Sequence, residues 1–210
     1  MILVKDTLVQ NFLVSKIFLE TIKIFDSKIF HIEYHQKRYE SILKEFGIDD
    51  IQDLTSFINP PDYGLYRCRL TYDLSVIPHK IDVTYHEYKK RDISTLKVVF
   101  DNDIDYGYKS TCRDDLNKLY DLKDDCDDII IIKDLLVTDT SVANIAFYTS
   151  SGWITPKNPL LKGTTRQRLI DDGKLFEADI KVQDIKQFSK IALLNAMIDF
   201  DILESCEFLI

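Results

Sequence analysis

The sequence predicts an α+β protein built from two lobes. Strand-like and helix-like segments are mixed along the 210 residues, without the regular strand–helix–strand alternation of a parallel α/β fold. The charged segment 89–94, with the residues Lys-Lys-Arg-Asp-Ile-Ser, is expected to link the two lobes. We therefore expect a smaller N-terminal α/β lobe over residues 1–92 and a C-terminal lobe of mixed strands and flanking helices over residues 93–210. A chain of this length can bury a sizeable core.

The N-terminal half begins with a predicted hairpin. Residues 17–25 are β-rich and partly alternating, residues 26–28 turn the chain, and residues 29–30 return. The next segment has an apolar stripe at helical spacing that ends at Gly47, which predicts a helix. This stripe consists of His35, Tyr39, Ile42, Leu43 and Phe46. After it we expect a short helix at 49–57, a loop at 59–64, and strands at 66–72 and 81–88.

The C-terminal half continues with a strand at 96–100 and then a helix that starts at Ser110 or Thr111. Thr111 and Asp114 have the spacing of a helix N-cap and its acidic partner. Two hairpins follow, because short apolar runs are separated by turn residues. They cover 129–132 with 135–138, and 144–148 with 153–155. We then expect a helix at 163–172, a strand near 180, a short helix at 184–188 and a strand at 191–195.

Composition narrows the class of protein. Hydrophobic content is 45% and charged content 30%, as in an ordinary soluble globular protein, and the net charge of -8 argues against a nucleic-acid binder. No apolar run reaches the roughly 18 residues of a membrane span, and Lys5-Asp6 interrupts any signal-peptide core. We therefore expect a cytoplasmic protein that does not bind a membrane. The four cysteines show neither CxxC spacing nor a His cluster, which favours free thiols and no metal site.

Three segments carry residues that could form one chemical site. Lys109 ends an extended stretch before a predicted helix, whose dipole would disfavour a protonated amine. Asp139 follows a buried strand. Gly163-Thr164-Thr165 opens a helix, where Thr164 and Gln167 could form a capping box and the free N–H groups could hold a phosphate. An amine for a Schiff base, an acid for a pyridinium nitrogen and a helix N-terminus for a phosphate are the parts of a pyridoxal phosphate site.

Three arginines are further candidates. Arg38 lies at the edge of the apolar stripe, where it could be a snorkelling side chain or a second phosphate ligand. Arg67 and Arg69 are two residues apart on a predicted strand and therefore point to one face. They could hold a substrate carboxylate or form salt bridges on a solvent face.

Together these segments resemble the class IV pyridoxal-phosphate enzymes. That family holds branched-chain aminotransferases, D-amino acid aminotransferases and 4-amino-4-deoxychorismate lyases. The resemblance covers most of the chain and rests on an ordered set of segments: 18–23 (Phe-Leu-Glu-Thr-Ile-Lys), 31–38, 138–145, 161–166 and 192–196.

The resemblance implies a D-amino acid aminotransferase-like fold, a homodimer, a small-molecule substrate and pyridoxal 5'-phosphate as cofactor. It makes Lys109 the Schiff-base lysine and Asp139 the partner of the ring nitrogen. The other implied cofactor contacts are Arg38, Asn144, Gly163, Thr164, Thr165 and Asn195, and Arg67 or Arg69 would hold a substrate carboxylate.

The chain departs from the family pattern at Asp139, at Asp114 and in the segment before the first strand. The family usually has Glu where this chain has Asp139, and branched-chain aminotransferases have Tyr where this chain has Asp114. The usual Asp-Arg-Gly-…-Gly-Asp-Gly run before the first strand is missing. Lys109 to Arg113 resembles the Lys-x-x-x-Arg stretch of aminodeoxychorismate lyases. This favours a lyase that gives 4-aminobenzoate and pyruvate for folate biosynthesis. An amino acid aminotransferase and a non-catalytic relative are the alternatives.

Overall fold

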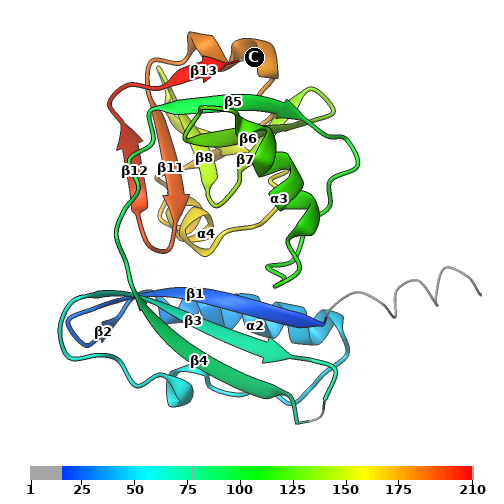
Figure 1. Cartoon of the computed structure of the whole chain (residues 1–210), viewed down its shortest axis with the longest axis vertical. Helices are drawn as coiled ribbons and strands as arrows, with labels where there is room; N and C mark the ends of the chain where they lie inside the picture. The colour runs from blue at the N-terminus through cyan, green and yellow to red at the C-terminus, as the bar shows by residue number, and fades with distance from the viewer. Residues whose placement is uncertain (1–15, 77, 210) are drawn as a thin grey trace, which may run out of the picture.

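The computed structural model describes residues 16–76 and 78–209, which form two lobes joined by a connector at 88–94 (Figure 1). The N-lobe contains an antiparallel sheet with α2 (Ile32–Glu45) packed against one face. The strands of this sheet, in spatial order, are β2 (Lys28–Ile29), β1 (Ile17–Phe25), β3 (Leu65–Asp73) and β4 (Lys80–Glu87).

The two faces of β1 have different roles because side chains alternate along a strand. Phe18, Ile22 and Ile24 are buried in the N-lobe core, where Tyr39 and Leu43 of α2 pack on them. The odd-numbered residues of β1 point the other way. Figure 1 shows β1 as the N-lobe strand that lies nearest the C-lobe.

The C-lobe is built on a larger mixed sheet. Its strands run in the order β10 (Phe176–Ala178), β9 (Gly152–Pro156), β8 (Asn144–Thr149), β7 (Leu136–Thr140), β6 (Asp128–Lys133), β5 (Thr95–Phe100) and β13 (Glu207–Leu209). β11 (Ile191–Asn195) pairs with β8 and with β12 (Asp199–Leu203). Two helices, α3 (Asp114–Tyr120) and α4 (Thr164–Asp171), flank the sheet, and α4 lies at the end nearest the N-lobe (Figure 1).

The prediction of a two-lobed α+β fold is confirmed, with local corrections. The expected helix at 49–57 is reduced to the 3₁₀ helix η1 (Leu54–Phe57), which Asp53 caps by accepting from Thr55 N–H at 2.9 Å. The expected short helix near 184–188 is also a 3₁₀ helix, η3 (Val182–Gln187). The strands β12 and β13 were not predicted. β5 and β6 are parallel with α3 between them, and β9 and β10 are parallel with α4 between them, so two strand–helix–strand units do occur.

The helix expected at Ser110 or Thr111 begins instead at Asp114. The reason is long-range pairing, because Thr111 N–H donates to the Ile17 carbonyl at 3.0 Å and Ser110 forms a bridge with Phe18. The Thr111 hydroxyl also contacts the Ile17 carbonyl, at 3.2 Å, and does not cap a helix. The N-cap residue is Arg113, and it makes no side-chain capping bond.

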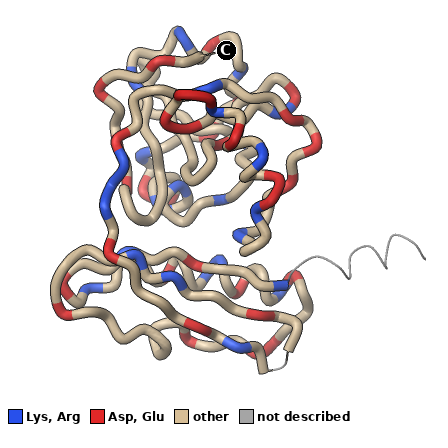
Figure 2. The backbone as a smooth tube through the Cα atoms, in the orientation of Figure 1, with Lys and Arg blue, Asp and Glu red and all other residues tan. Residues whose placement is uncertain are grey.

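The connector between the lobes is basic, as Figure 2 shows. Two of its side chains form ion pairs with the C-lobe: Lys90 with Asp201 at 2.5 Å and Arg91 with Asp128 at 3.6 Å. The 3₁₀ turn η2 (Asp121–Lys123) follows α3 directly along the chain. No helix in the described ranges is long and apolar enough to cross a membrane.

Candidate active site

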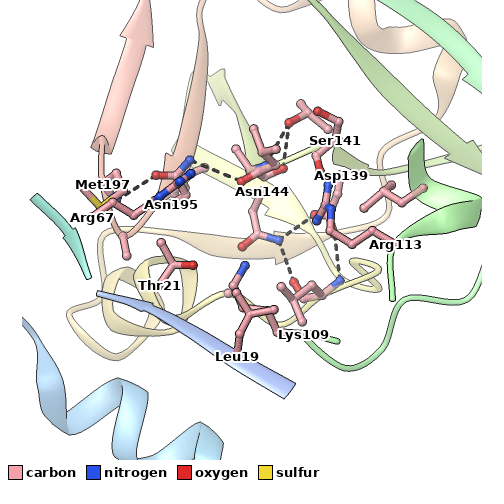
Figure 3. A pocket seen from close by; sticks show the side chains of 18 of the residues that line it. Leu19, Thr21, Arg67, Lys109, Arg113, Asp139, Ser141, Asn144, Asn195 and Met197 are labelled. Atoms are coloured by element: carbon pink, nitrogen blue, oxygen red, sulfur yellow. Dashed lines mark hydrogen bonds between the residues drawn. The ribbon is translucent and has the colours of Figure 1, made fainter. Parts of the chain in front are cut away.

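A cavity of about 650 Å³ lies between the two lobes. Its N-lobe wall comes from β1 and β3, through Leu19, Thr21 and the arginines at 67 and 69. Its C-lobe wall comes from the segment after β5, from the β7–β8 turn, from the entry to α4 and from the β11–β12 turn. Predicted site residues that lie more than 150 positions apart in the sequence therefore line the same cavity (Figure 3).

Lys109 is fixed at the boundary between the lobes by its backbone. Its carbonyl accepts from Leu19 N–H at 2.9 Å, so the segment continues the edge of the N-lobe sheet. Figure 3 shows the side chain beside Leu19 and below Asn144. Within the described residues, the amine of Lys109 forms no hydrogen bond or ion pair. It is therefore available to a ligand.

Burial and the nearby Arg38 guanidinium lower the pKa of Lys109 to about 7. An ammonium group loses hydration in the partly buried cavity, and neighbouring positive charge adds repulsion. A large fraction of the amine is then neutral and nucleophilic at physiological pH. The helix-dipole explanation offered for this lysine was wrong, since α3 starts five residues later.

Arg38 is held by a fully buried carboxylate that the sequence reasoning did not include among the site residues. Its Nε donates to Glu20 at 2.9 Å and its Nη2 donates to the other oxygen of the same carboxylate. His35 Nδ1 donates to Glu20 at 2.6 Å. Burial tends to raise the pKa of Glu20, but Arg38 and His35 outweigh it and bring the pKa to about 2. Arg38 is therefore a pre-positioned guanidinium in the cavity wall rather than a snorkelling side chain.

Asp139 is buried on the C-lobe side of the cavity. One carboxylate oxygen accepts from Asn144 Nδ2 at 2.7 Å, and the other accepts from Leu161 N–H at 2.9 Å. Asn144 Nδ2 also donates to the Leu161 carbonyl at 2.8 Å. Burial raises the pKa of Asp139 to about 6, against the lowering effect of these hydrogen bonds. The carboxylate keeps lone pairs for one more donor, such as a protonated ring nitrogen.

The entry to α4 is packed closely against Asn144. A Cβ atom on Gly163 would lie 2.0 Å from Asn144 Oδ1, so only glycine fits without movement. Gly163 is the N-cap of α4, so Thr164 is the first residue inside the helix and the capping box predicted for Thr164 and Gln167 is absent. Among the described residues, no side chain accepts from the first N–H groups of the helix, which is the arrangement that binds a phosphate.

The two threonines and the arginine that follow Gly163 differ in position. Thr164 lines the cavity and is buried, whereas Thr165 is buried but lies outside the cavity lining. Arg166 points away, because it donates to the Pro156 carbonyl at 2.8 Å and pairs with Glu177 at 2.6 Å. Arg166 thus ties α4 to β9 and β10.

The mouth of the cavity carries cations. Arg67 and Arg69 are exposed, lie on one face of β3 as predicted, and have no ion-pair partner in the described part of the chain. Arg113 donates to the Ser141 carbonyl at 2.8 Å and to the Tyr106 hydroxyl at 3.3 Å, again without a carboxylate partner among these residues. The alternative of a salt-bridged surface pair for the two β3 arginines therefore has no support.

Asn195, at the end of β11, also lines the cavity. Its side chain caps the following turn, since Oδ1 accepts from Met197 N–H at 2.9 Å and from Ile198 N–H at 3.1 Å. All predicted site residues except Thr165 thus border the cavity. Glu20 and Arg113 were missed. A lone Glu on the inward, otherwise apolar face of a strand was the available signal for Glu20.

The fold and this cavity define a class of protein, namely a two-lobed fold with a buried lysine of lowered pKa in the cavity between its lobes. The chain belongs to the class IV aminotransferase family, because the model described as Amino-transferase class IV matches residues 18–201. Members of this family are pyridoxal-phosphate enzymes. The predictions of the fold, of an enzyme and of pyridoxal 5'-phosphate as cofactor are therefore confirmed at the level of the family.

Relatives agree with this assignment. An uncharacterized protein of Haemophilus influenzae is 36% identical over 184 residues, which is 85% of this chain and 96% of that protein. A crystal structure from Haemophilus somnus, provisionally described as a 4-amino-4-deoxychorismate lyase, is 34% identical, with a TM-score of 0.73 over 86% of this chain and 96% of that one. The PLP-bound form of a Mycobacterium tuberculosis protein, described as a hypothetical aminotransferase, shares the fold at 14% identity, with a TM-score of 0.74 over 91% and 81% of the two chains.

Proposed function

We propose that this chain is a pyridoxal-phosphate-dependent 4-amino-4-deoxychorismate lyase, which releases pyruvate and leaves 4-aminobenzoate. The observation that carries the proposal is the charge of the cavity. One lysine of lowered pKa shares it with Arg67, Arg69 and Arg113, and none of these three has a carboxylate partner among the described residues. In a protein of net charge -8, this concentration of unpaired cations favours a dianionic substrate. Aminodeoxychorismate carries two carboxylates and an amine.

The residues of the cavity fit the cofactor. Lys109 supplies the amine, Asp139 has acceptor capacity for the ring nitrogen, and the free N–H groups at the start of α4 suit the phosphate. Gly163 supports this fit, because its missing Cβ lets the Asn144 amide that holds Asp139 approach the helix entry. When bound, pyridoxal phosphate supplies an aldehyde that takes up the substrate amine and a ring that withdraws electrons from the reacting carbon.

Arg38 is the second candidate ligand for the cofactor phosphate. Its Nε and Nη2 are occupied by Glu20, so its remaining edge is available to a phosphate oxygen. The fork with Glu20 fixes the guanidinium plane before any ligand arrives, which reduces the entropy lost on binding. We assign to Arg38 the role of second phosphate ligand, as the family resemblance implies.

The proton transfers belong to Lys109. With a pKa of about 7 the free amine can remove the proton at C4 of the substrate ring and return a proton to the departing enolpyruvate. The ring becomes aromatic and the leaving group becomes pyruvate, with no water and no second substrate consumed. Arg67 or Arg69 would hold one carboxylate, and Arg113, which also lines the cavity, would hold the other.

The relative from Haemophilus somnus supports the lyase over the aminotransferase alternative, because its description names that activity and it covers most of this chain. The Lys-x-x-x-Arg spacing also supports it, since Arg113 borders the cavity. A homodimer, a place in folate biosynthesis and a cytoplasmic location are parts of the same proposal.

The test is product formation by the purified protein with pyridoxal phosphate and aminodeoxychorismate. A lyase releases pyruvate and 4-aminobenzoate in equal amounts without any keto acid acceptor. Amino transfer from glutamate, leucine or D-alanine to a keto acid, with no pyruvate from aminodeoxychorismate, would instead establish an aminotransferase. A protein that does neither and shows no visible cofactor band would be a non-catalytic relative.

Three variants and one control sharpen this test. Lys109→Ala should abolish turnover and the borohydride-sensitive absorbance, whereas Lys118→Ala, an exposed lysine of α3, should change neither. Arg67→Met or Arg69→Met should raise KM at least about tenfold at whichever position grips the carboxylate, because a hydrogen bond to a charged group contributes roughly 1.5–3 kcal/mol.

A further inference from the structure

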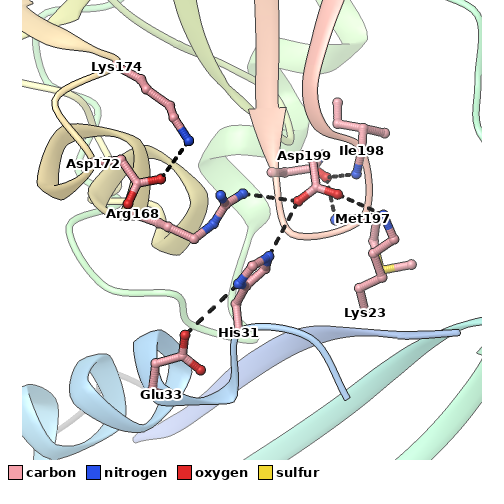
Figure 4. A network of polar contacts seen from close by, with 10 residues as sticks. Lys23, His31, Glu33, Arg168, Asp172, Lys174, Met197, Ile198 and Asp199 are labelled. Carbon is pink, nitrogen blue, oxygen red and sulfur yellow. Dashed lines mark hydrogen bonds and ion pairs between the residues drawn. The ribbon is translucent and has the colours of Figure 1, made fainter. Parts of the chain in front are cut away.

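Asp199 connects the two lobes close to the cavity but outside its lining. One oxygen of its carboxylate accepts from Lys23 Nζ at 2.7 Å and the other accepts from Arg168 Nη2 at 3.1 Å. The ring of His31 faces the same carboxylate at 4.0 Å. Figure 4 shows these side chains converging on Asp199 from separate elements.

The partners of Asp199 belong to both lobes. Lys23 lies on β1, on the face that also presents Leu19 and Thr21 to the cavity. His31 is the N-cap of α2. Arg168 lies on α4, one turn after the helix entry at Gly163. A single carboxylate therefore joins the N-lobe sheet and helix to the C-lobe helix whose first N–H groups face the cavity.

Asp199 also ends the turn between β11 and β12. Its φ of 55° is left-handed, a conformation that Asp tolerates better than most residues. Asn195, Ala196 and Met197 of the same turn line the cavity. Any displacement of Asp199 would therefore move part of the cavity wall as well as the interlobe contact.

The contact is more sheltered than an ordinary surface ion pair. The side chains of Lys23 and Arg168 are 20% and 17% exposed, against 65% for Lys174, which pairs with Asp172 just after the end of α4. Burial and the neighbouring Arg168 lower the pKa of His31, so Lys23 and Arg168 supply the positive charge. Without the carboxylate, two cations from opposite lobes would face each other in a partly buried space, which favours separation of the lobes.

We propose that Asp199 is a positioning residue for the cofactor site, which holds α4 and the β11–β12 turn against the N-lobe. It acts by keeping the helix entry at Gly163 and the Arg38 side of the cavity at the separation that one bound ligand needs. The inference rests on the proposed function only in taking pyridoxal phosphate as that ligand.

The test measures the dissociation constant of pyridoxal phosphate by absorbance titration. Asp199→Asn should weaken binding roughly tenfold, as expected for loss of a partly buried charge pair. Lys174→Met, which removes only the exposed ion pair just after the same helix, should bind like the wild type. Lys23→Met should weaken binding less than Asp199→Asn. The double variant Lys23→Met/Asp199→Asn should raise the dissociation constant by less than the product of the two single-variant factors, because both substitutions remove the same interaction.

A second readout separates positioning from general stability. Limited proteolysis of the cofactor-free proteins should cut the connector at 88–94 faster in Asp199→Asn than in Lys174→Met, even where their melting temperatures are equal. Unchanged affinity in Asp199→Asn, or equal weakening in Lys174→Met, would overturn the inference. If Asp199→Asn does not fold, the test rests on Lys23→Met alone. Unchanged pyridoxal phosphate affinity and unchanged proteolysis of the connector in Lys23→Met would then overturn the inference.

The outcomes also separate this inference from the proposed function. If the wild-type protein binds no pyridoxal phosphate, the proposed function fails. The interlobe role of Asp199 is then judged by proteolysis alone, and equal cutting of Asp199→Asn and the wild type overturns it.

Discussion

Replacing Gly163 by Ala should be among the most damaging small changes in this protein. The added methyl group would meet Asn144 Oδ1 at 2.0 Å and Asn144 Cγ at 3.2 Å, so the amide of Asn144 must move. That amide donates to Asp139 at 2.7 Å and to the Leu161 carbonyl at 2.8 Å. The substitution therefore breaks the contacts that hold the buried carboxylate, although it lies in a different segment.

The magnitude follows from those two hydrogen bonds. A neutral bond contributes about 1 kcal/mol and a bond to a carboxylate about 1.5–3 kcal/mol, so Gly163→Ala should lower the free energy of unfolding by roughly 2.5–4 kcal/mol. Urea denaturation of the cofactor-free protein measures this. Gly107→Ala is the matched control, because a Cβ there would meet only the Asp105 side chain, at 3.6 Å. It should stay within about 0.5 kcal/mol of the wild type.

A double substitution tests the cause. If the clash with Asn144 is responsible, Gly163→Ala added to Asn144→Ala should cost little beyond Asn144→Ala alone, since the obstructing amide is already gone. Fully additive losses, or a Gly163→Ala protein as stable as Gly107→Ala, would refute the reasoning.

Two further predictions concern buried charge and pH. Lys109→Met should stabilise the cofactor-free protein by roughly 2–5 kcal/mol below pH 7. The folded-state pKa of about 7 lies below the unfolded value of 10.5, so this gain should narrow as the pH rises from 7 toward 10.5. A gain that does not vary across this range would contradict the lowered pKa. Glu20→Gln should cost about 3–5 kcal/mol at pH 7, because it leaves Arg38 without its buried partner. The folded-state pKa of Glu20, about 2, lies below the ordinary 4.5, so its contribution is present above pH 4.5 and is lost as the pH falls toward 2. Denaturation curves that show the same loss at pH 7 and at the lowest pH that still permits folding would argue against it.

Local sequence patterns predicted most of the strands and helices correctly. The apolar stripe from His35 to Leu43 gave the buried face of α2, and the isoleucine run at 129–132 gave a fully buried strand. The pattern failed where backbone partners were distant. Residues 110 and 111 pair with β1 instead of starting a helix, and no local signal distinguishes these two outcomes.

The candidate site shows the same division. The order of Lys109, Asp139 and Gly163 along the chain pointed to one kind of site, because each residue type suits one part of the same chemistry. The sequence did not indicate that Asn144 would hold Asp139, or that the pKa of Lys109 would fall through burial beside Arg38 rather than through a helix dipole. Those relations depend on side chains from separate segments meeting in a cavity.

By itself, the sequence determined the family, the two-lobed α+β class and the residues able to carry the chemistry, because these depend on residue type and short spacing. The tertiary structure alone decided which charges are paired. Glu20 neutralises Arg38 in the N-lobe core. Asp199 pairs with Arg168 and also with Lys23, which is 176 residues away along the chain. Arg67 and Arg69 have no ion-pair partner among the described residues. The physical reason is that electrostatic energy depends on distance and burial in three dimensions, and neither is a function of position along the chain.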